Sequence, residues 1–407
     1  MRRCHRVGAA ARGRALTVAV TLAVAGTLAA CSSASSTAPA ASSTAAGAPS
    51  ASMATSVATS ADAWAVLPMS ADPAFWEVFA RSGSSPTWKL VTPPGVADNG
   101  GLVVSPGGAN SLSVAVRPSQ DLLFSPLAAT SDGGASWSAG PPLTAAVAAS
   151  PDAFAADGAS LVALLGDGAV ETSADSGTAW SVIAKPGAIA ASAAGQGCGG
   201  TVRVTSVSFG LATVAVTSGK LAVTSTNVLA GGTCGTTSGA ALFSYSPGTG
   251  WQRVSLPASG QLVRLTGGMA LVQGKSGLSA LWRGTGWYAY APLSSASTPQ
   301  PAPTNWSASA ALPASGQVIA SGTLTLGGAW VLLSGGRAAL IGGPGQQWTL
   351  LPPVPAKTTV LAAGPDGATD ALAVSGFTLT VWRLAPKATV WQKVEAVSVP
   401  VQVGSSS

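Results

Sequence analysis

Tryptophans recur along most of the chain, each after a turn rich in Gly, Pro or Ser and each before a short apolar segment. Their spacings are 49, 43, 71, 36, 61 and 43 residues, which average near 50. A unit of this length holds a few short strands but no complete core of its own, so such units must pack against one another. The seven tryptophans are Trp88, Trp137, Trp180, Trp251, Trp287, Trp348 and Trp391.

The segments between these tryptophans have the patterns of β-strands. Residues 112–116 and 377–381 alternate in polarity, and residues 161–165 form a continuous apolar run. No segment carries a helical stripe, and 50 glycines with 28 prolines agree with many short strands joined by turns. A repeat near 50 residues lies in the range of a four-stranded propeller blade. We therefore predict an all-β fold, a seven-bladed β-propeller over residues 61–404.

Two of the seven turns carry a fuller side-chain pattern. An Asp in each can accept hydrogen bonds from backbone N–H groups of the turn, and a Gly can take a positive φ. The pattern therefore predicts turns held together by their own side chains, with a structural role. The residues are Thr130, Asp132, Gly134, Ser136 and Trp137 in the first turn, and Ser173, Asp175, Gly177 and Trp180 in the second.

This pattern of Ser/Thr, Asp, Gly, Ser/Thr and Trp resembles the Asp-box, or BNR repeat, of sialidase-like β-propellers. The second turn departs from it at Ala179, where a hydroxyl is usual. The resemblance implies that each turn joins the third and fourth strands of a blade, so the strand after each Trp should be outermost. The five turns that lack the Asp are at residues 83–88, 246–251, 283–287, 343–348 and 385–391.

The first blade needs a fourth strand from one end of the chain. A strand at residues 397–403 would join the two termini in one blade, which closes a propeller and hides its sheet edges. Pro400 cannot donate to a ladder, and the alternative donor, residues 54–60, is more polar. The sequence leaves the choice between these two donors open. The other three strands are predicted at residues 62–69, 74–81 and 87–92.

The N-terminal sequence has the pattern of a lipoprotein signal peptide. An Arg-rich start precedes sixteen uncharged residues, 15–30, a length that suits a signal-peptide core better than a membrane span. The run ends in Leu-Ala-Ala-Cys at residues 28–31, which resembles the lipobox of bacterial lipoproteins. That resemblance implies cleavage after residue 30 and acylation of Cys31, which anchors the protein in the lipid bilayer on the extracytoplasmic face. The alternative is an ordinary secreted protein.

The composition of residues 31–60 predicts a flexible tether. They are almost entirely Ala, Ser, Thr, Pro and Gly, a composition that buries too little apolar surface to offset the entropy of ordering. The wider bias toward Ala, Gly, Val and Thr is typical of GC-rich genomes and suggests an actinobacterial source.

The basic charge of the chain is concentrated in the leader. The net charge is +6, but five of the 20 basic residues lie in the first fourteen positions, which leaves 15 basic against 14 acidic residues. No basic stripe remains for a nucleic acid, so we expect no nucleic-acid partner.

Two cysteines lie in the insertion that produces the longest tryptophan spacing. Besides Cys31, the predicted mature chain has only Cys198 and Cys234, and an oxidising compartment favours a disulfide between them. A zinc site lacks ligands because no histidine accompanies the pair. A second insertion, at residues 294–303, is rich in Ser, Pro and Thr and precedes Trp306.

The residue content argues against catalysis. The only histidine, His5, lies in the leader, which excludes Ser-His-Asp and Cys-His chemistry and His-ligated metals. The family resemblance implies an arginine triad, a Tyr/Glu pair and an Asp acid near the channel in active members. Here the tyrosines and two glutamates adjoin peripheral turns, so we expect no catalytic residue, metal or cofactor. They are Tyr245, Tyr288, Tyr290, Glu171 and Glu395.

A few charged residues at the ends of predicted inner strands are candidates for a recognition surface. They are Asp152, Arg264, Asp366 and Asp370, together with Trp306 beside the second insertion.

We interpret the chain as a monomeric, non-catalytic, membrane-anchored propeller that binds a protein or a cell-envelope polymer. The alternatives are a sialidase-like glycoside hydrolase and an assembly factor for a membrane complex.

Overall fold

The computed structural model describes much of the chain from residue 55 to residue 399. The predicted signal peptide, Cys31, most of the tether, Trp287, Tyr288, Tyr290 and the insertion at 294–303 lie outside the described residues. The described residues are 55–58, 62–69, 76–82, 85, 87–93, 102–108, 110–116, 125–139, 146–147, 151–194, 198, 202–210, 213–217, 220–225, 227–235, 239–266, 268–283, 306–312, 316–324, 328–364 and 366–399.

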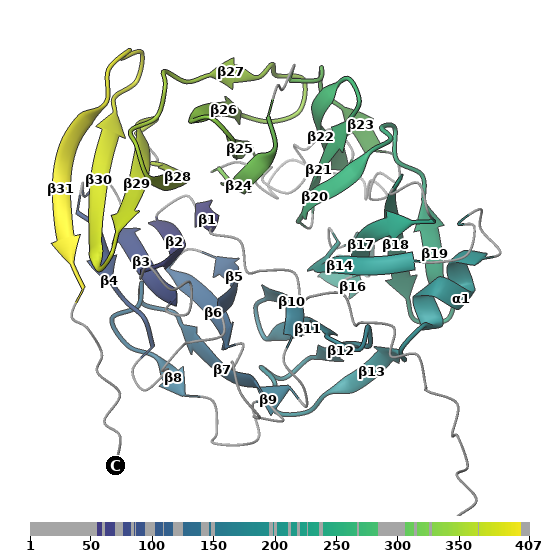
Figure 1. The fold of residues 1–407 in the computed structure, drawn as a ribbon. Helices are drawn as coiled ribbons and strands as arrows, with labels where there is room; N and C mark the ends of the chain where they lie inside the picture. Colours follow the sequence, from purple (N-terminus) through teal and green to yellow (C-terminus); the bar gives the residue numbers. More distant parts are fainter. Residues whose placement is uncertain are drawn as a thin grey trace, which may run out of the picture. The chain divides into compact units, whose positions relative to one another are not determined.

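The fold is a seven-bladed β-propeller, as predicted. Seven antiparallel sheets are arranged radially around a common centre, and each sheet comes from one contiguous stretch of chain (Figure 1). We number the blades 1 to 7 in chain order and the strands of each blade outward from the centre.

The first three blades contain the following strands. Blade 1 has β1 (Thr55–Ala58), β2 (Asp62–Pro68), β3 (Trp76–Ser82) and β4 (Lys89–Leu90). Blade 2 has β5 (Leu102–Gly108), β6 (Ser111–Val116), β7 (Ser125–Thr130) and β8 (Ser138–Ala139), with β9 (Ala146–Val147) also paired to β7. Blade 3 has β10 (Pro151–Asp157), β11 (Ser160–Leu165), β12 (Val170–Ser173) and β13 (Ser181–Ala184).

Blade 4 contains two additions. Helix α1 (Ala188–Ala194) precedes it, and the hairpin of β15 (Thr213–Thr217) and β16 (Lys220–Ser225) separates its first two strands. The blade itself has β14 (Val202–Phe209), β17 (Val228–Cys234), β18 (Gly239–Ser246) and β19 (Gly250–Val254). No helix among the described residues is long and apolar enough to span a membrane.

The last three blades have four strands each. Blade 5 has β20 (Gln261–Leu265), β21 (Met269–Gly274), β22 (Gly277–Arg283) and β23 (Trp306–Ala308). Blade 6 has β24 (Val318–Thr323), β25 (Ala329–Leu333), β26 (Arg337–Ile341) and β27 (Thr349–Leu350). Blade 7 has β28 (Thr358–Ala363), β29 (Thr369–Ser375), β30 (Thr378–Leu384) and β31 (Gln392–Ser398).

The inner strand of blade 1 comes from the N-terminal one of the two candidate donors. Strand β1, within the alternative segment 54–60, is the innermost strand of blade 1 and pairs with β2. Strand β31, which includes residues 397 and 398, is the outermost strand of blade 7, so no blade of the described residues combines segments from both ends. The hydroxyls that made residues 54–60 look unfavourable are used in hydrogen bonds. Ser56 Oγ donates to Leu361 O of β28 and accepts from Trp330 Nε1 of β25 at 2.8 Å.

In blade 5 too, the outermost strand begins with a tryptophan, but this tryptophan is not the one predicted. The outer strand β23 begins at Trp306, after the second insertion, whereas the prediction used Trp287. Trp306 is 8% exposed and packs with Leu281 and other apolar residues of the core. It is therefore a core residue and not, as predicted, part of a recognition surface.

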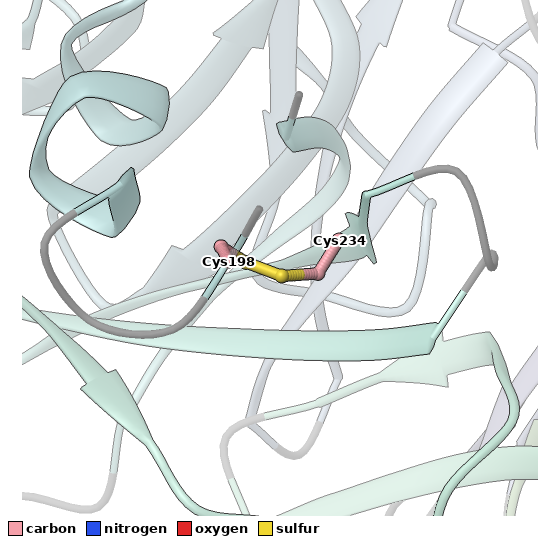
Figure 2. Close-up of a disulfide and its surroundings, with 2 residues drawn as sticks. All are labelled: Cys198 and Cys234. Carbon is pink, nitrogen blue, oxygen red and sulfur yellow. A yellow bond between two sulfur atoms is a disulfide. The ribbon is translucent and has the colours of Figure 1, made fainter. Parts of the chain in front are cut away.

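The predicted disulfide between Cys198 and Cys234 is present (Figure 2). It links the segment after α1 to the end of β17, and both residues are buried. The backbone N–H of Cys198 donates to Ala193 O of α1, so the bond also fixes the end of this helix on blade 4.

We expect the double substitution Cys198→Ser and Cys234→Ser to lower the free energy of unfolding by about 3–4 kcal/mol. The bond joins residues 36 positions apart, and a crosslink of this length removes entropy from the unfolded chain. Urea unfolding of the variant and of the oxidised and reduced wild type measures the effect. Equal stability of the oxidised and reduced wild type would contradict the expectation.

Candidate functional site

Six of the seven inner strands contain a β-bulge, and only β1 has none. One residue is skipped in the register of each, between Pro151 and Ala153 in β10, between Leu262 and Arg264 in β20, and at one place in each of four other inner strands. A bulge inserts one unpaired residue and increases the local twist of the strand. Asp152 is itself the bulged residue of β10, and Arg264 is the first paired residue after the bulge in β20.

Arg264 extends from blade 5 to two other blades. Its Nη1 donates to Thr55 Oγ1 of β1 at 2.8 Å and to Ser321 O of β24 at 3.0 Å. Thr55 Oγ1 in turn donates to Ser321 O at 2.8 Å. Strand β1 contacts β24 and β28, the inner strands of blades 6 and 7, so this cluster lies where inner strands of separate blades converge (Figure 1). We call Arg264, Thr55 and Ser321 the axial cluster.

Burial affects the electrostatics of the axial cluster. Arg264 as a whole residue is half-buried, but protein surrounds its guanidinium, and desolvation lowers the pKa of this group to about 10. Arg264 therefore remains cationic at neutral pH in a site with little water. Arg264, one of the five predicted recognition residues, thus contacts the inner strands of two other blades.

Asp370 lies in a different place from the one predicted. It belongs to β29, the second strand of blade 7, and it is 0% exposed, so it cannot belong to a recognition surface. Its Oδ2 accepts from Arg81 Nη1 of β3 at 2.7 Å and from Trp88 Nε1 at 3.0 Å. Arg383 of β30 donates to the same carboxylate at 2.8 Å and 3.1 Å. We call these four residues the closure cluster, because they connect blade 7 to blade 1.

The closure cluster shifts the pKa of both arginines. Burial lowers the pKa of Arg81, although the charge of Asp370 opposes this effect. The hydrogen bonds with Asp370 raise the pKa of the more exposed Arg383. Gly364 leaves room for the cluster, because a Cβ there would collide with Arg81 Nη2 and Asp366 Oδ1. The predicted recognition residue Asp366 is exposed beside this cluster, and its Oδ1 accepts from Ala368 N at 3.2 Å.

The turn at residues 130–137 is closed by its own side chains. Thr130 Oγ1 donates to Asp132 Oδ1 at 2.8 Å and accepts from the backbone N–H of Gly134 at 3.0 Å. Asp132 also accepts from Ser136 N at 2.9 Å and from Ser136 Oγ at 2.5 Å. Gly134 has φ of 84°, and a Cβ there would lie 2.7 Å from Val91 Cβ. Trp137, the last residue of this turn, packs partly buried against the core.

The turn at residues 173–180 has the same arrangement. Ser173 Oγ donates to Asp175 Oδ1 at 2.7 Å and accepts from Gly177 N at 2.9 Å, and Asp175 accepts from Ala179 N at 3.0 Å. Trp180 Nε1 donates to Gly177 O at 3.1 Å. Both turns connect the third and fourth strands of their blades, in agreement with the expected peripheral position. The hydroxyl at the first position also accepts a backbone hydrogen bond in both turns, in addition to the Asp that the pattern predicts as an acceptor.

The glutamates and the described tyrosine, Tyr245, are not on inner strands. Glu77 of β3 accepts from Thr92 Oγ1, and Glu395 of β31 accepts from Trp88 N at 2.9 Å. Glu171 is on β12, the third strand of blade 3, and Tyr245 on β18 packs against Trp251 at 5.2 Å between ring centroids. The three glutamates of the chain and Tyr245 are thus on third or fourth strands. Within the described part of the chain, no three His, Cys, Asp or Glu side chains group as metal ligands.

Sequence comparisons assign no family. No family model matches the chain, and no curated protein matches it.

Comparison with solved structures gives likenesses of fold. The structure of YCF48 bound to D1 peptide is 16% identical, with 83% of this chain and 93% of that chain covered and a TM-score of 0.46. YCF48 from Cyanidioschyzon merolae is also 16% identical, with 83% and 97% covered and a TM-score of 0.48. The SapL1 lectin in complex with alpha methyl fucoside is 12% identical, with 86% and 98% covered and a TM-score of 0.40. At these identities the likeness concerns the fold alone.

We expect Asp370→Asn to lower the free energy of unfolding by about 3–5 kcal/mol, because it leaves two buried or half-buried arginines without their shared counter-charge. Urea unfolding measures the loss. The matched control is Asp157→Asn at the exposed end of β10, which should change stability by about 0.5 kcal/mol or less. Equal stability of the two variants would show that Asp370 does not hold blades 1 and 7 together.

We expect Asp132 to titrate well below the usual range of an aspartate. Hydrogen bonds from Ser136 Oγ, Ser136 N and Thr130 Oγ1 lower its pKa to about 2, from an ordinary 3.8. Because the folded-state pKa is lowered, the stabilisation from this turn is complete above the ordinary pKa and is lost as pH falls toward 2. Carbonyl-detected NMR titration measures this pKa.

Substitution at one position of each turn tests the cause. Ser136→Ala should raise the pKa of Asp132, and Ala179→Ser should lower further the already lowered pKa of Asp175. An unchanged pKa in both variants would contradict the role of this hydroxyl.

Proposed function

We propose that this chain is a non-catalytic propeller, anchored through acylated Cys31 on the extracytoplasmic face of the cell membrane, that binds a protein or a cell-envelope polymer. The binding part of the proposal rests on the propeller fold, whose inner strands bring an arginine from blade 5 to blades 1 and 6. The anchoring part rests on the Leu-Ala-Ala-Cys sequence at residues 28–31, which follows an apolar run and precedes a low-complexity segment.

One observation favours binding over catalysis. The glutamates and the described tyrosine are on third or fourth strands, and several already have structural partners. A retaining or inverting glycosidase needs two carboxyl groups, or a Tyr/Glu pair, on either side of one substrate bond. Glu77, Glu395 and Tyr245 are on different third or fourth strands and do not converge in this way. Their partners are Thr92, Trp88 and Trp251, respectively. The glycoside hydrolase alternative is therefore disfavoured.

The test uses the full-length chain with an affinity tag in a bacterial host that processes lipoproteins, together with the variant Cys31→Ser. We expect mass spectrometry to find acyl chains on residue 31 of the wild type and none on the variant. The wild type should fractionate with membranes, because two or three acyl chains hold a protein on a bilayer.

The same two proteins then serve for capture from solubilised membrane and wall fractions. A partner of the propeller should be enriched at a stoichiometric ratio by both, whereas material that follows the lipid anchor should be enriched by the wild type alone. A subunit of a membrane complex would identify the assembly role, and a polymer would identify envelope binding. Enrichment of nothing by both proteins would contradict the platform, and an unacylated wild type would contradict the anchor.

A further inference from the structure

Exposed apolar side chains gather at the outer edges of blades 6 and 7. Five large apolar side chains are exposed among the described residues, and three of them lie here. Val390 (69% exposed) precedes β31, Val394 (43%) lies within it, and Leu350 (66%) ends β27, the outermost strand of blade 6 (Figure 1). Trp391 Nε1 donates to Pro352 O at 3.4 Å. The segments that carry Val390 and Leu350 are therefore in contact.

Two exposed lysines lie in the same stretch of blade 7. Lys387 is in the turn before β31, and Lys393 is the second residue of that strand. Among the described residues neither lysine forms an ion pair. The carboxylate of Glu395 is engaged with blade 1, because it accepts from Trp88 N at 2.9 Å. No exposed carboxylate occurs in β27, in β31 or in the turn at residues 385–391, so this edge is cationic as well as apolar.

The backbone of β31 disfavours pairing with a strand of another protein. Val394 is skipped in the pairing with β30, between Lys393 and Glu395, so it is a bulged residue. Bulges and lysines on an edge strand prevent the addition of a further strand. They do not account for valines that stay exposed beside them. This edge therefore offers side chains, and not main-chain hydrogen bonds, to a partner.

We propose that this edge, which we call the rim surface, contacts the anionic headgroups of a phospholipid bilayer. The rim surface consists of Leu350, Lys387, Val390, Lys393 and Val394. This inference rests on the proposed membrane location and adds which side of the propeller lies on the bilayer. Lysines attract anionic headgroups, and apolar side chains beside them enter the boundary between headgroups and acyl chains. A bilayer needs no strand pairing, which agrees with the bulged edge.

The predicted anchor allows this orientation. The chain from Cys31 to the start of β1 at Thr55 is about 24 residues long and spans at most about 80 Å when extended. A blade of four strands is about 15–20 Å wide, because neighbouring strands lie about 4.8 Å apart. A tether of this length reaches from the innermost strand past the rim. No charged residue lies between Cys31 and Thr55, so electrostatic attraction to the bilayer must come from the propeller.

The test uses the mature chain from residue 31 with Cys31→Ser, exported with a signal peptide that is cleaved without acylation. This protein carries no lipid of its own. It is mixed with vesicles of phosphatidylglycerol and phosphatidylcholine, or of phosphatidylcholine alone, and bound protein is measured by flotation. We expect binding to the vesicles that contain phosphatidylglycerol and little binding to the others. High salt should weaken the binding, because it screens the lysines.

Paired substitutions test the two components of the rim surface. Lys387→Gln with Lys393→Gln should weaken vesicle binding about tenfold or more, since each lysine near an anionic surface contributes about fivefold. Val390→Ser with Val394→Ser should weaken it severalfold, because the apolar contact is lost. All four positions are exposed, so these variants should unfold at the same urea concentration as the unsubstituted chain.

Blade 3 offers a matched control. Val182 on its outermost strand β13 is exposed, and the exposed Lys185 follows that strand. Val182→Ser with Lys185→Gln should leave vesicle binding unchanged. A fluorophore sensitive to polarity, attached through Val390→Cys, should shift its emission to shorter wavelengths when vesicles with phosphatidylglycerol are added. The same label attached through Val182→Cys should not shift.

The proposal is overturned if the protein does not bind vesicles with phosphatidylglycerol, or if the rim and blade 3 variants bind them equally. Unchanged vesicle binding by the rim variants, together with loss of a captured protein, would assign the rim surface to an acidic protein partner instead. None of these results depends on acylation of Cys31, so the anchor and the rim contact fail separately.

Discussion

The buried carboxylate of Asp370 is the interaction on which closure of the propeller depends. Every blade is formed by a contiguous stretch of chain, so among the described strands no ladder joins the first blade to the last. Asp370 instead accepts hydrogen bonds from Arg81 and Trp88 of blade 1 and from Arg383 of its own blade. A buried ion pair contributes little net energy compared with apolar packing, but it specifies which surfaces meet. Specific side-chain contacts thus do here what a shared sheet does when a blade combines both termini.

Strand β1 provides a second closure, near the centre. Its two hydroxyl residues bond to main-chain atoms of two neighbouring inner strands, through Thr55 to Ser321 O and through Ser56 to Leu361 O. Main-chain carbonyls of inner strands have no further strand to pair with, so short hydroxyl side chains satisfy them. This need explains why a polar four-residue segment occupies a position for which an apolar strand seemed better suited.

Much of the fold was predictable from the sequence because the tryptophan repeat reports the blade length and the turns report strand order. The inner strand of blade 1 and the outer strand of blade 5 were not predictable in this way. Hydrophobic patterning does not show which hydroxyls will serve as hydrogen-bond donors, or where a blade contains an insertion. Asp370 was misplaced for a related reason. A charge within an apolar strand, such as Asp370 in β29 or Arg81 in β3, signals burial with a partner, and this signal was available in the sequence. Which charges meet depends on tertiary contacts.

The entry point of the chain into the propeller has a mechanical consequence. The described part of the chain enters the propeller at Thr55, on the innermost strand and not at the rim. A pulling force applied to the chain ahead of Thr55 would therefore act first on the bonds that Thr55 and Ser56 make to blades 6 and 7. Because Arg264 also bonds to Thr55, the same force would reach blade 5 through the axial cluster.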